Sequence, residues 1–220
     1  MLKSFRSLYV CFMIVVAVMA SFIAIPATQA HPKSPESHSL YSHLNSSPDL
    51  TPRIAAPQTT TLLSEGFENG TKTSYPTGAV TLTSGSWTLN NALIGDTAAD
   101  PKTGTKSLRI CNLGKATMNF NVTGPGTLAI KHARHGTDPQ ASWELWSSTN
   151  NGGAWTRVGV PMTAYQTSLG TASFPVNISS QVRFEIRKTT GNTDSSRLNF
   201  DDITFTRGTN SGSQAQPKGK

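Results

Sequence analysis

Residues 143–158 have the sequence WELWSSTNNGGAWTRV. In the first part Trp143 and Leu145 alternate with Glu144 and Trp146, which is the period expected of a β-strand with one buried face. The last four residues alternate in the same way. The NNGG segment between the two parts tolerates positive φ angles and favours a tight turn. We therefore predict a β-hairpin that organises the core of the fold.

Three of the four tryptophans of the chain lie in this hairpin. Tryptophan is most often buried, so one interpretation is that Trp143, Trp146 and Trp155 all pack into the core. The alternative follows from the alternation. Trp146 shares its face with Glu144 and would then lie on an open sheet surface, where its ring could stack on a ligand.

The first 30 residues have the features of a secretory signal peptide. Lys3 and Arg6 supply positive charge, Leu8–Ile25 is almost continuously apolar, and small residues lead up to Ala30. Cleavage after Ala30 predicts a secreted protein, extracellular or periplasmic, with no stable membrane insertion. The apolar run is also long enough for an uncleaved anchor, which stays an alternative.

Cysteine content and charge limit the remaining classes. Removal of residues 1–30 leaves Cys111 as the only cysteine, so we expect no disulfide within the mature chain, and we expect a monomer. The signal carries two of the 19 basic residues and none of the 12 acidic ones, which leaves a net charge of +5. A basic surface favours polyanions such as nucleic acids or acidic polysaccharides. No cluster of lysine and arginine is dense enough to establish nucleic-acid binding alone.

The composition changes twice along the mature chain. Residues 31–61 are rich in Ser, Pro, His and Thr and predict a disordered linker, and residues 207–220 predict a flexible tail. Residues 62–206 are short β-rich runs separated by Gly, Asn, Asp and Pro, which predicts one all-β domain, an antiparallel β-sandwich or jelly roll. The predicted strands are Leu62–Glu68, Ala79–Thr83, Ser86–Leu89, Ala92–Ile94, Ser107–Ile110, Lys115–Val122, Gly126–Arg134, Ser142–Ser148, Trp155–Val160, Ser168–Pro175, Gln181–Lys188 and Arg197–Thr206.

The last of these strands contains an irregularity. Leu198 and Phe200 share one face, whereas Ile203 and Phe205 are out of phase with them by one residue. Both pairs can face the core only if the two aspartates between them form a β-bulge. A bulge would turn one of the two carboxylates aside, toward a partner.

These aspartates and the acids of the first strand suggest a metal site. If the first and last strands are neighbours, oxygen atoms of Glu65, Glu68, Asp201 and Asp202 could converge on a structural calcium ion. The alternative is that the same carboxylates accept hydrogen bonds from backbone N–H groups or from arginines of the last two strands.

Several segments together resemble one family. The resemblance spans about residues 62–206 and is to the accessory β-jelly-roll domain of secreted Bacteroidetes proteins, especially those found beside extracellular DNA/RNA non-specific endonucleases. In such nucleases this module stands beside a separate catalytic domain. The segments that carry the resemblance are LSEGFENGTKTSY at 63–75, GSWTLNNALIG at 85–95, KTGTKSLRI at 102–110, KHA at 131–133, the tryptophan hairpin, RFEIRK at 183–188 and NFDDI at 199–203.

The resemblance implies a non-catalytic module. The nucleases use a histidine and a metal-binding asparagine in a ββα domain that would follow this one, and only a short polar segment follows Phe205 here. The resemblance therefore leaves two alternatives. The chain is an accessory module by itself, or it is a fragment of a longer nuclease whose catalytic domain is missing.

The residues themselves also argue against an enzyme. No nucleophile elbow, CxxC pair, HExxH motif or phosphate-binding glycine loop occurs. Glu144 and Glu185 could form the carboxylate pair of a glycosidase, but ion pairing with nearby arginines is the simpler explanation. His132 lies on the same face as Ile130, which favours a buried, hydrogen-bonded histidine over a catalytic base.

We therefore predict binding on one face of a sheet. In Gln181–Lys188 the apolar residues would face the core, and Arg183, Glu185 and Arg187 would line the opposite face. If Glu144 and Trp146 share that face, it holds an aromatic ring surrounded by charges. Sugars and nucleic acids both suit such a surface, so a glycan-binding module and a nucleic-acid-binding accessory domain remain open alternatives, beside a spacer that binds nothing.

Overall fold

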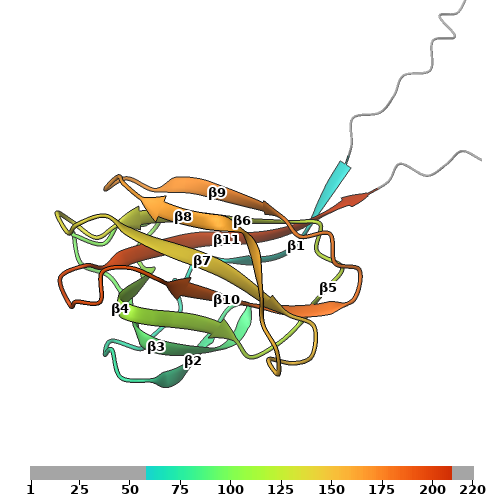
Figure 1. Cartoon of the computed structure of the whole chain (residues 1–220), viewed down its shortest axis with the longest axis horizontal. Helices are drawn as coiled ribbons and strands as arrows, with labels where there is room; N and C mark the ends of the chain where they lie inside the picture. Colours follow the sequence, from blue (N-terminus) through green and yellow to red (C-terminus); the bar gives the residue numbers. More distant parts are fainter. Residues whose placement is uncertain (1–57, 210–220) are drawn as a thin grey trace, which may run out of the picture. The chain divides into compact units, whose positions relative to one another are not determined.

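The computed structural model describes residues 58–209, and this part of the chain is built from strands and turns without a helix. It therefore contains no helical segment of the length and apolarity needed to cross a membrane. The predicted signal peptide, most of the predicted linker and the end of the tail lie outside the described residues. The strands are β1 (Gln58–Glu65), β2 (Gly78–Leu82), β3 (Gly85–Gly95), β4 (Ser107–Met118), β5 (Val122–Thr123), β6 (Thr127–Arg134), β7 (Ala141–Ser148), β8 (Thr156–Ala164), β9 (Gly170–Pro175), β10 (Gln181–Lys188) and β11 (Leu198–Thr209), coloured in chain order in Figure 1.

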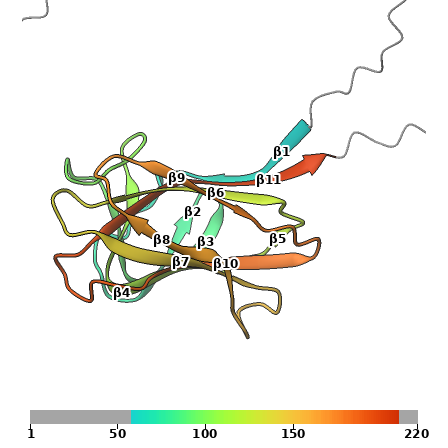
Figure 2. The same ribbon diagram turned by 45° about the horizontal axis from the view of Figure 1, so that its top comes forward.

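The strands form two antiparallel layers, which Figure 2 shows one above the other. One layer has the order β2-β3-β4-β10-β7-β8, and we call it the front sheet; the other consists of β1, β11, β6 and β9, and we call it the back sheet. β4 belongs to both layers. Its first half pairs with β11 and its second half with β10, so the two sheets join along this strand. The predicted all-β jelly roll is confirmed.

The tryptophan hairpin is present as β7 and β8. Trp143 and Leu145 are buried, whereas Glu144 and Trp146 point to the other face. Asn151 and the following glycine adopt positive φ angles of 59° and 90° in the turn, as the NNGG segment predicts. The side-chain oxygen of Asn150 accepts hydrogen bonds from the hydroxyl of Ser148 and from the backbone N–H of Ala154, both 2.8 Å, which fixes the turn.

Aromatic rings hold the two layers together. Trp143 of the front sheet meets the rings of Phe174 and Phe200 edge to face, with centroids 5.7 and 5.0 Å apart. The rings of Phe184 of β10 and Phe205 of β11 also meet across the layers, tilted by 45° with centroids 5.2 Å apart. Each ring of this size removes a large apolar area from water, so these contacts account for a major part of the stability.

The predicted bulge in the last strand is confirmed. The register of β11 against β6 shifts between Asp201 and Thr204, and Asp202 has a φ of 44°. Ile203 and Phe205 thereby return to the core face, where both are buried. Burial of these apolar side chains on one side offsets the irregular backbone.

The strand boundaries differ from the prediction in several places, and β8 for example continues to Ala164. The predicted strands at 86–89 and 92–94 are one strand, β3, which continues through a bulge at Asn91 with a φ of 46°. Likewise the runs from Ser107 to Val122 form the long β4 and the short β5. β1 begins at Gln58 and pairs with the end of β11 up to Thr209, so both ends of the domain extend into the predicted linker and tail. These extensions are rich in threonine, which favours strands.

Candidate functional site

The five predicted ligand-binding residues lie on the outer face of the front sheet. β7 and β10 are hydrogen-bonded neighbours, and their register sets Glu144 opposite Arg187 and Trp146 opposite Glu185. Arg183 lies two residues from Glu185 and so shares this face. Figure 1 shows β8, β7, β10 and β4 side by side, and we call their outward surface the charged face.

Trp146 is not an open platform. The guanidinium carbon of Arg187 lies 4.2 Å from the centroid of the Trp146 ring, a cation–π contact that covers one side of the indole. The indole nitrogen donates a hydrogen bond of 2.9 Å to Glu144, and Arg187 also lies 5.8 Å from the ring of Trp155. The interpretation that Trp146 packs in the core is therefore wrong. Trp146 lies beside Glu144 on the outer face, as the alternative predicts, but Arg187 covers part of its ring, and stacking on a ligand stays a prediction.

Glu185 fixes Arg187 in this position. Its carboxylate is 1% exposed and accepts hydrogen bonds from Arg187 and the hydroxyl of Thr117, with the ammonium of Lys115 at 3.1 Å. Burial by itself would raise the pKa of Glu185, but the hydrogen bonds from Thr117, Arg187 and Lys115 outweigh burial and lower the pKa. The carboxylate is thus ionised at neutral pH and holds two cations on the face.

Arg183 extends the charged face toward the hairpin turn. Its Nε donates to Asn121 at 2.9 Å, and a terminal nitrogen donates to Asn151 at 3.3 Å. Asn121 in turn donates to Asn151, so the two amides and the guanidinium form one network. The turn that the NNGG segment builds therefore also positions an arginine.

Two cations of the charged face were missed in the sequence. Arg157 lies opposite Trp146 on β8 and forms an ion pair of 3.1 Å with Glu144, and Lys115 lies opposite Arg187 on β4. Arg157 could have been found from the hairpin alternation, but Lys115 depends on a pairing of strands far apart in sequence. With them the face carries four cationic and two anionic side chains, so its net charge is positive.

The acids predicted to bind calcium have protein partners. Glu65 is buried and accepts backbone hydrogen bonds from Phe67 at 2.6 Å and Ser84 at 2.8 Å. Glu68 is exposed and accepts from the backbone of Thr105 and the residue after it. The alternative prediction, hydrogen bonds from backbone N–H groups, describes these two carboxylates.

The two aspartates of the bulge have different environments. Asp202 pairs with the ammonium of Lys131 at 2.7 Å, so its cation is a lysine and not one of the predicted arginines. Asp201 is fully buried and accepts backbone hydrogen bonds from Thr103 and Asp202. Burial, together with the charges of Asp202 and Glu68, raises the pKa of Asp201 to about 6. Within residues 58–209 no three His, Cys, Asp or Glu side chains gather as a metal site requires, and calcium stays a prediction.

Comparison with known proteins shows the fold. No protein-family model and no curated protein matches the chain. Among solved structures, the K1 cleaved adhesin domain of Lys-gingipain from Porphyromonas gingivalis W83 has a TM-score of 0.50 at 13% identity, covering 67% of this chain and 97% of that domain. The CBM22-1 xylan-binding domain of Xyn10C from Paenibacillus barcinonensis has a TM-score of 0.46 at 15% identity, and the match covers 70% of this chain and 97% of that domain. The C-terminal CBM6 of LamC, a laminarinase of Zobellia galactanivorans, has a TM-score of 0.42 at 15% identity, and the match covers 68% of this chain and 100% of that domain.

These structures are adhesin and carbohydrate-binding-module domains with a jelly-roll fold. At a TM-score of 0.50 and 13% identity, the likeness to the K1 adhesin domain shows the fold alone, and the ligand has to be argued from the residues of this chain. The predicted accessory jelly-roll domain is thus confirmed as a fold. Its association with nucleases remains a prediction.

Proposed function

We propose that this chain is a secreted, non-catalytic module that binds an extracellular glycan carrying acidic groups, and that the glycan lies across the charged face. The observation that carries the proposal is the contact between the Arg187 guanidinium and the Trp146 ring, with Glu185 holding the guanidinium in place. Cation and ring are thus presented together, on a rigid sheet, before any ligand arrives.

The chemistry of these groups matches an acidic sugar. A guanidinium donates two parallel hydrogen bonds to a carboxylate or sulfate, and an indole edge or face contacts the apolar side of a sugar ring. Because Glu185 and Glu144 already order Arg187 and Trp146, little side-chain entropy would be lost on binding. The surplus of cations on the charged face favours an acidic polymer over a neutral one.

The carboxylates of the charged face argue for binding and against hydrolysis. A glycosidase needs one carboxylic acid whose pKa is raised so that it can donate a proton. The pKa of Glu185 is lowered instead, and its partner candidate Glu144 is engaged by Arg157 and Trp146. Both acids serve to orient cations.

Affinity electrophoresis tests this function. The purified domain is run through gels containing polygalacturonate or a sulfated glycan, and through gels containing neutral xylan or β-1,3-glucan. We expect retardation by the acidic polymers, weakening steeply between about 50 and 200 mM salt. Arg187→Ala should abolish retardation, whereas Arg207→Ala, which removes the same charge from the back sheet, should leave it intact.

Two results would overturn the proposal. Retardation by neutral polymers alone, unaffected by salt, would mean that the cations do not take part. Single-stranded DNA that displaces the domain from polygalacturonate at a much lower concentration of charged groups would identify a nucleic-acid accessory domain instead.

A further inference from the structure

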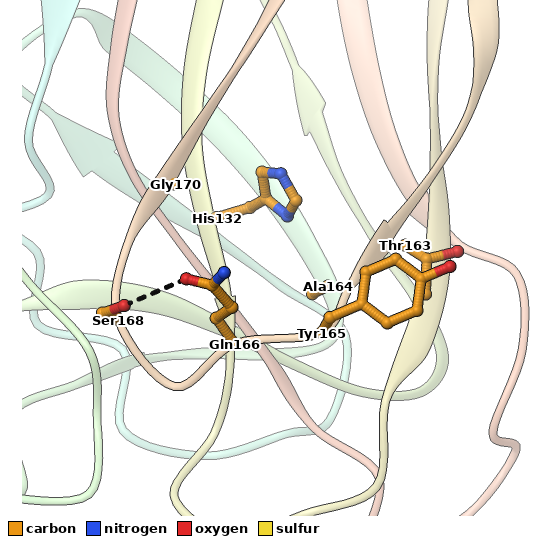
Figure 3. Close-up of a pocket in the computed structure, with 7 residues that line it drawn as sticks. All are labelled: His132, Thr163, Ala164, Tyr165, Gln166, Ser168 and Gly170. Atoms are coloured by element: carbon orange, nitrogen blue, oxygen red, sulfur yellow. Dashed lines mark hydrogen bonds between the residues drawn. The ribbon is translucent and has the colours of Figure 1, made fainter.

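A pocket of about 200 Å³ lies away from the charged face, where the chain crosses from β8 of the front sheet to β9 of the back sheet. Figure 3 shows its lining, with the His132 imidazole, the Gln166 side chain and the Tyr165 ring around one opening. The volume has room for several water molecules, which is the scale of a single sugar ring. The lining residues are His132, Thr163, Ala164, Tyr165, Gln166, Ser168 and Gly170.

The lining of the pocket combines apolar surface with polar groups and has no formally charged side chain. Its walls supply hydroxyl groups, a carboxamide and an imidazole, all of which hydrogen-bond to neutral hydroxyl groups. This composition differs from that of the charged face, where four cations meet two carboxylates. The two surfaces therefore suit different ligands.

His132 acts as a fixed neutral donor. Its Nδ1 lies 3.2 Å from the indole nitrogen of the buried Trp143, which can only donate, so the hydrogen-bond network assigns the ring proton to Nε2. Burial lowers the pKa of His132, which keeps the ring neutral at physiological pH. Nε2 has no hydrogen-bond partner among residues 58–209 and is left for a ligand.

The loop that closes the pocket is held in place and presents an aromatic ring. Tyr165 is 65% exposed, although a ring of this size is normally packed. The backbone N–H of Arg134 donates to the carbonyl of Gln166 at 2.9 Å, and the Ser168 hydroxyl donates to the Gln166 side chain at 3.4 Å. The loop is thus anchored to β6, which keeps Tyr165 beside the opening.

We propose that this pocket is a second binding site, which takes one uncharged pyranose unit of a glycan, with the His132 Nε2–H and the Gln166 carboxamide bonding its hydroxyls and Tyr165 contacting its ring. The proposal rests on the glycan-binding function, but it names a separate site and a neutral ligand. Because the pocket holds a single ring, the unit it takes is a chain end or a side branch.

A titration with neutral methyl pyranosides tests the pocket alone. The methyl glycosides of glucose, galactose, mannose and xylose are added to the ¹⁵N-labelled domain, and amide shifts are followed by NMR. We expect at least one sugar to shift the amides of residues 163–170 and the ring signals of His132. The charged face should not respond, since these sugars carry no charge.

Three variants locate the site without disturbing the fold. Tyr165→Ala should weaken binding about tenfold, the scale of a lost stacking contact. Gly170 is part of the lining, so Gly170→Val should fill part of the pocket. The fold should accept this change, because a Cβ at Gly170 meets no atom within 4 Å and valine favours strands. His132→Asn keeps an acceptor for Trp143, removes the Nε2 donor and should also weaken binding. Val160→Ala removes a comparably exposed apolar side chain from β8 and serves as the control.

The outcomes separate this inference from the proposed function. Shifts at residues 163–170 that are lost in Tyr165→Ala and Gly170→Val but kept in Val160→Ala would support the pocket, whatever the charged face binds. The inference is wrong if no pyranoside shifts these amides, or if the shifts survive Gly170→Val. Retardation by polygalacturonate would remain unaffected in either case.

Discussion

Trp143 and Trp146 lie three residues apart on β7, and the two faces of the strand hold them in different ways. Trp143 is buried among aromatic rings, with Phe200 5.0 Å and Phe174 5.7 Å away. Trp146 is held from outside by the Arg187 guanidinium and the Glu144 carboxylate. β7 therefore carries one ring that stabilises the core and one ring that is held on the surface by charged side chains.

The two tryptophans differ in the kind of contact that holds them, and this difference separates a stabilising residue from a binding residue. The contacts of Trp143 depend on buried area, which changes little with salt or with pH. The contacts of Trp146 depend on charges near the surface, which salt screens and acid removes. The Trp146 ring therefore adds less to folding than the Trp143 ring does, and its fixed position suits contact with a ligand.

The largest expected effect comes from exchanging the two tryptophans for alanine, one at a time. Trp143→Ala should lower the free energy of unfolding by about 3–5 kcal/mol, because it leaves a cavity between the layers. Trp146→Ala should lower it by about 1 kcal/mol, since removing a partly exposed ring from the surface leaves no closed cavity. Urea unfolding followed by circular dichroism measures both. Equal losses would contradict the distinction between the two faces of β7.

Asp201 is a buried carboxylate, and burial raises its pKa although the ammonium of Lys131, which pairs with Asp202, also attracts it. With a folded-state pKa of about 6 against about 3.8 when unfolded, the folded protein binds more protons between these values, so its stability falls as the pH rises through this window. In EDTA, we expect wild type to lose up to about 3 kcal/mol relative to Asp201→Asn between pH 4 and pH 7. Thermal unfolding at both pH values measures the difference.

Comparing wild type with Asp201→Asn also tests the predicted calcium site. If the predicted calcium site exists, adding calcium at pH 7 should raise the unfolding temperature of wild type and leave Asp201→Asn unchanged. An equal response of both proteins would refute a calcium ion at Asp201. A parallel pH profile of the two in EDTA would contradict the raised pKa.

For Glu185, the free energy of unfolding should change with pH in the opposite direction to that for Asp201, and by less. Its folded-state pKa is lowered, so its contribution is present above about pH 4.5, the value for the unfolded chain, and is lost as the pH falls through the folded-state pKa. Glu185→Gln should therefore be less stable than wild type by about 2 kcal/mol at pH 7, and the gap should close in acid. Urea midpoints at pH 7 and pH 3 measure it. Asp96→Asn, on an exposed loop, is the control, and a gap independent of pH would refute the account.

The fold was predictable because its signals are local. Alternation of apolar residues predicted Trp143 and Leu145 as core residues, and the NNGG segment predicted the turn that Asn151 makes. The phase change around the two aspartates predicted the bulge in β11. Each signal lies within about ten residues, the range over which strand period and turn chemistry act.

The arrangement of the binding surfaces was less predictable because it depends on distant pairings. The sequence placed Trp146 and Arg187 on one face, but only the register of β7 against β10 puts the guanidinium over the ring. Lys115 joins them through a third strand. The pocket combines His132 of β6 with a loop more than 30 residues later, and no motif marks it.

Titration of the ¹⁵N-labelled domain with an acidic oligosaccharide such as trigalacturonate, followed by NMR amide shifts, shows whether the charged face binds an acidic glycan. We predict shifts along residues 144–146 and 183–187, together with the side-chain signals of Trp146 and Arg187, and their loss in Arg187→Ala at unchanged fold. Shifts confined to the back sheet, or no shifts at low salt, would mean that the charged face does not bind the oligosaccharide.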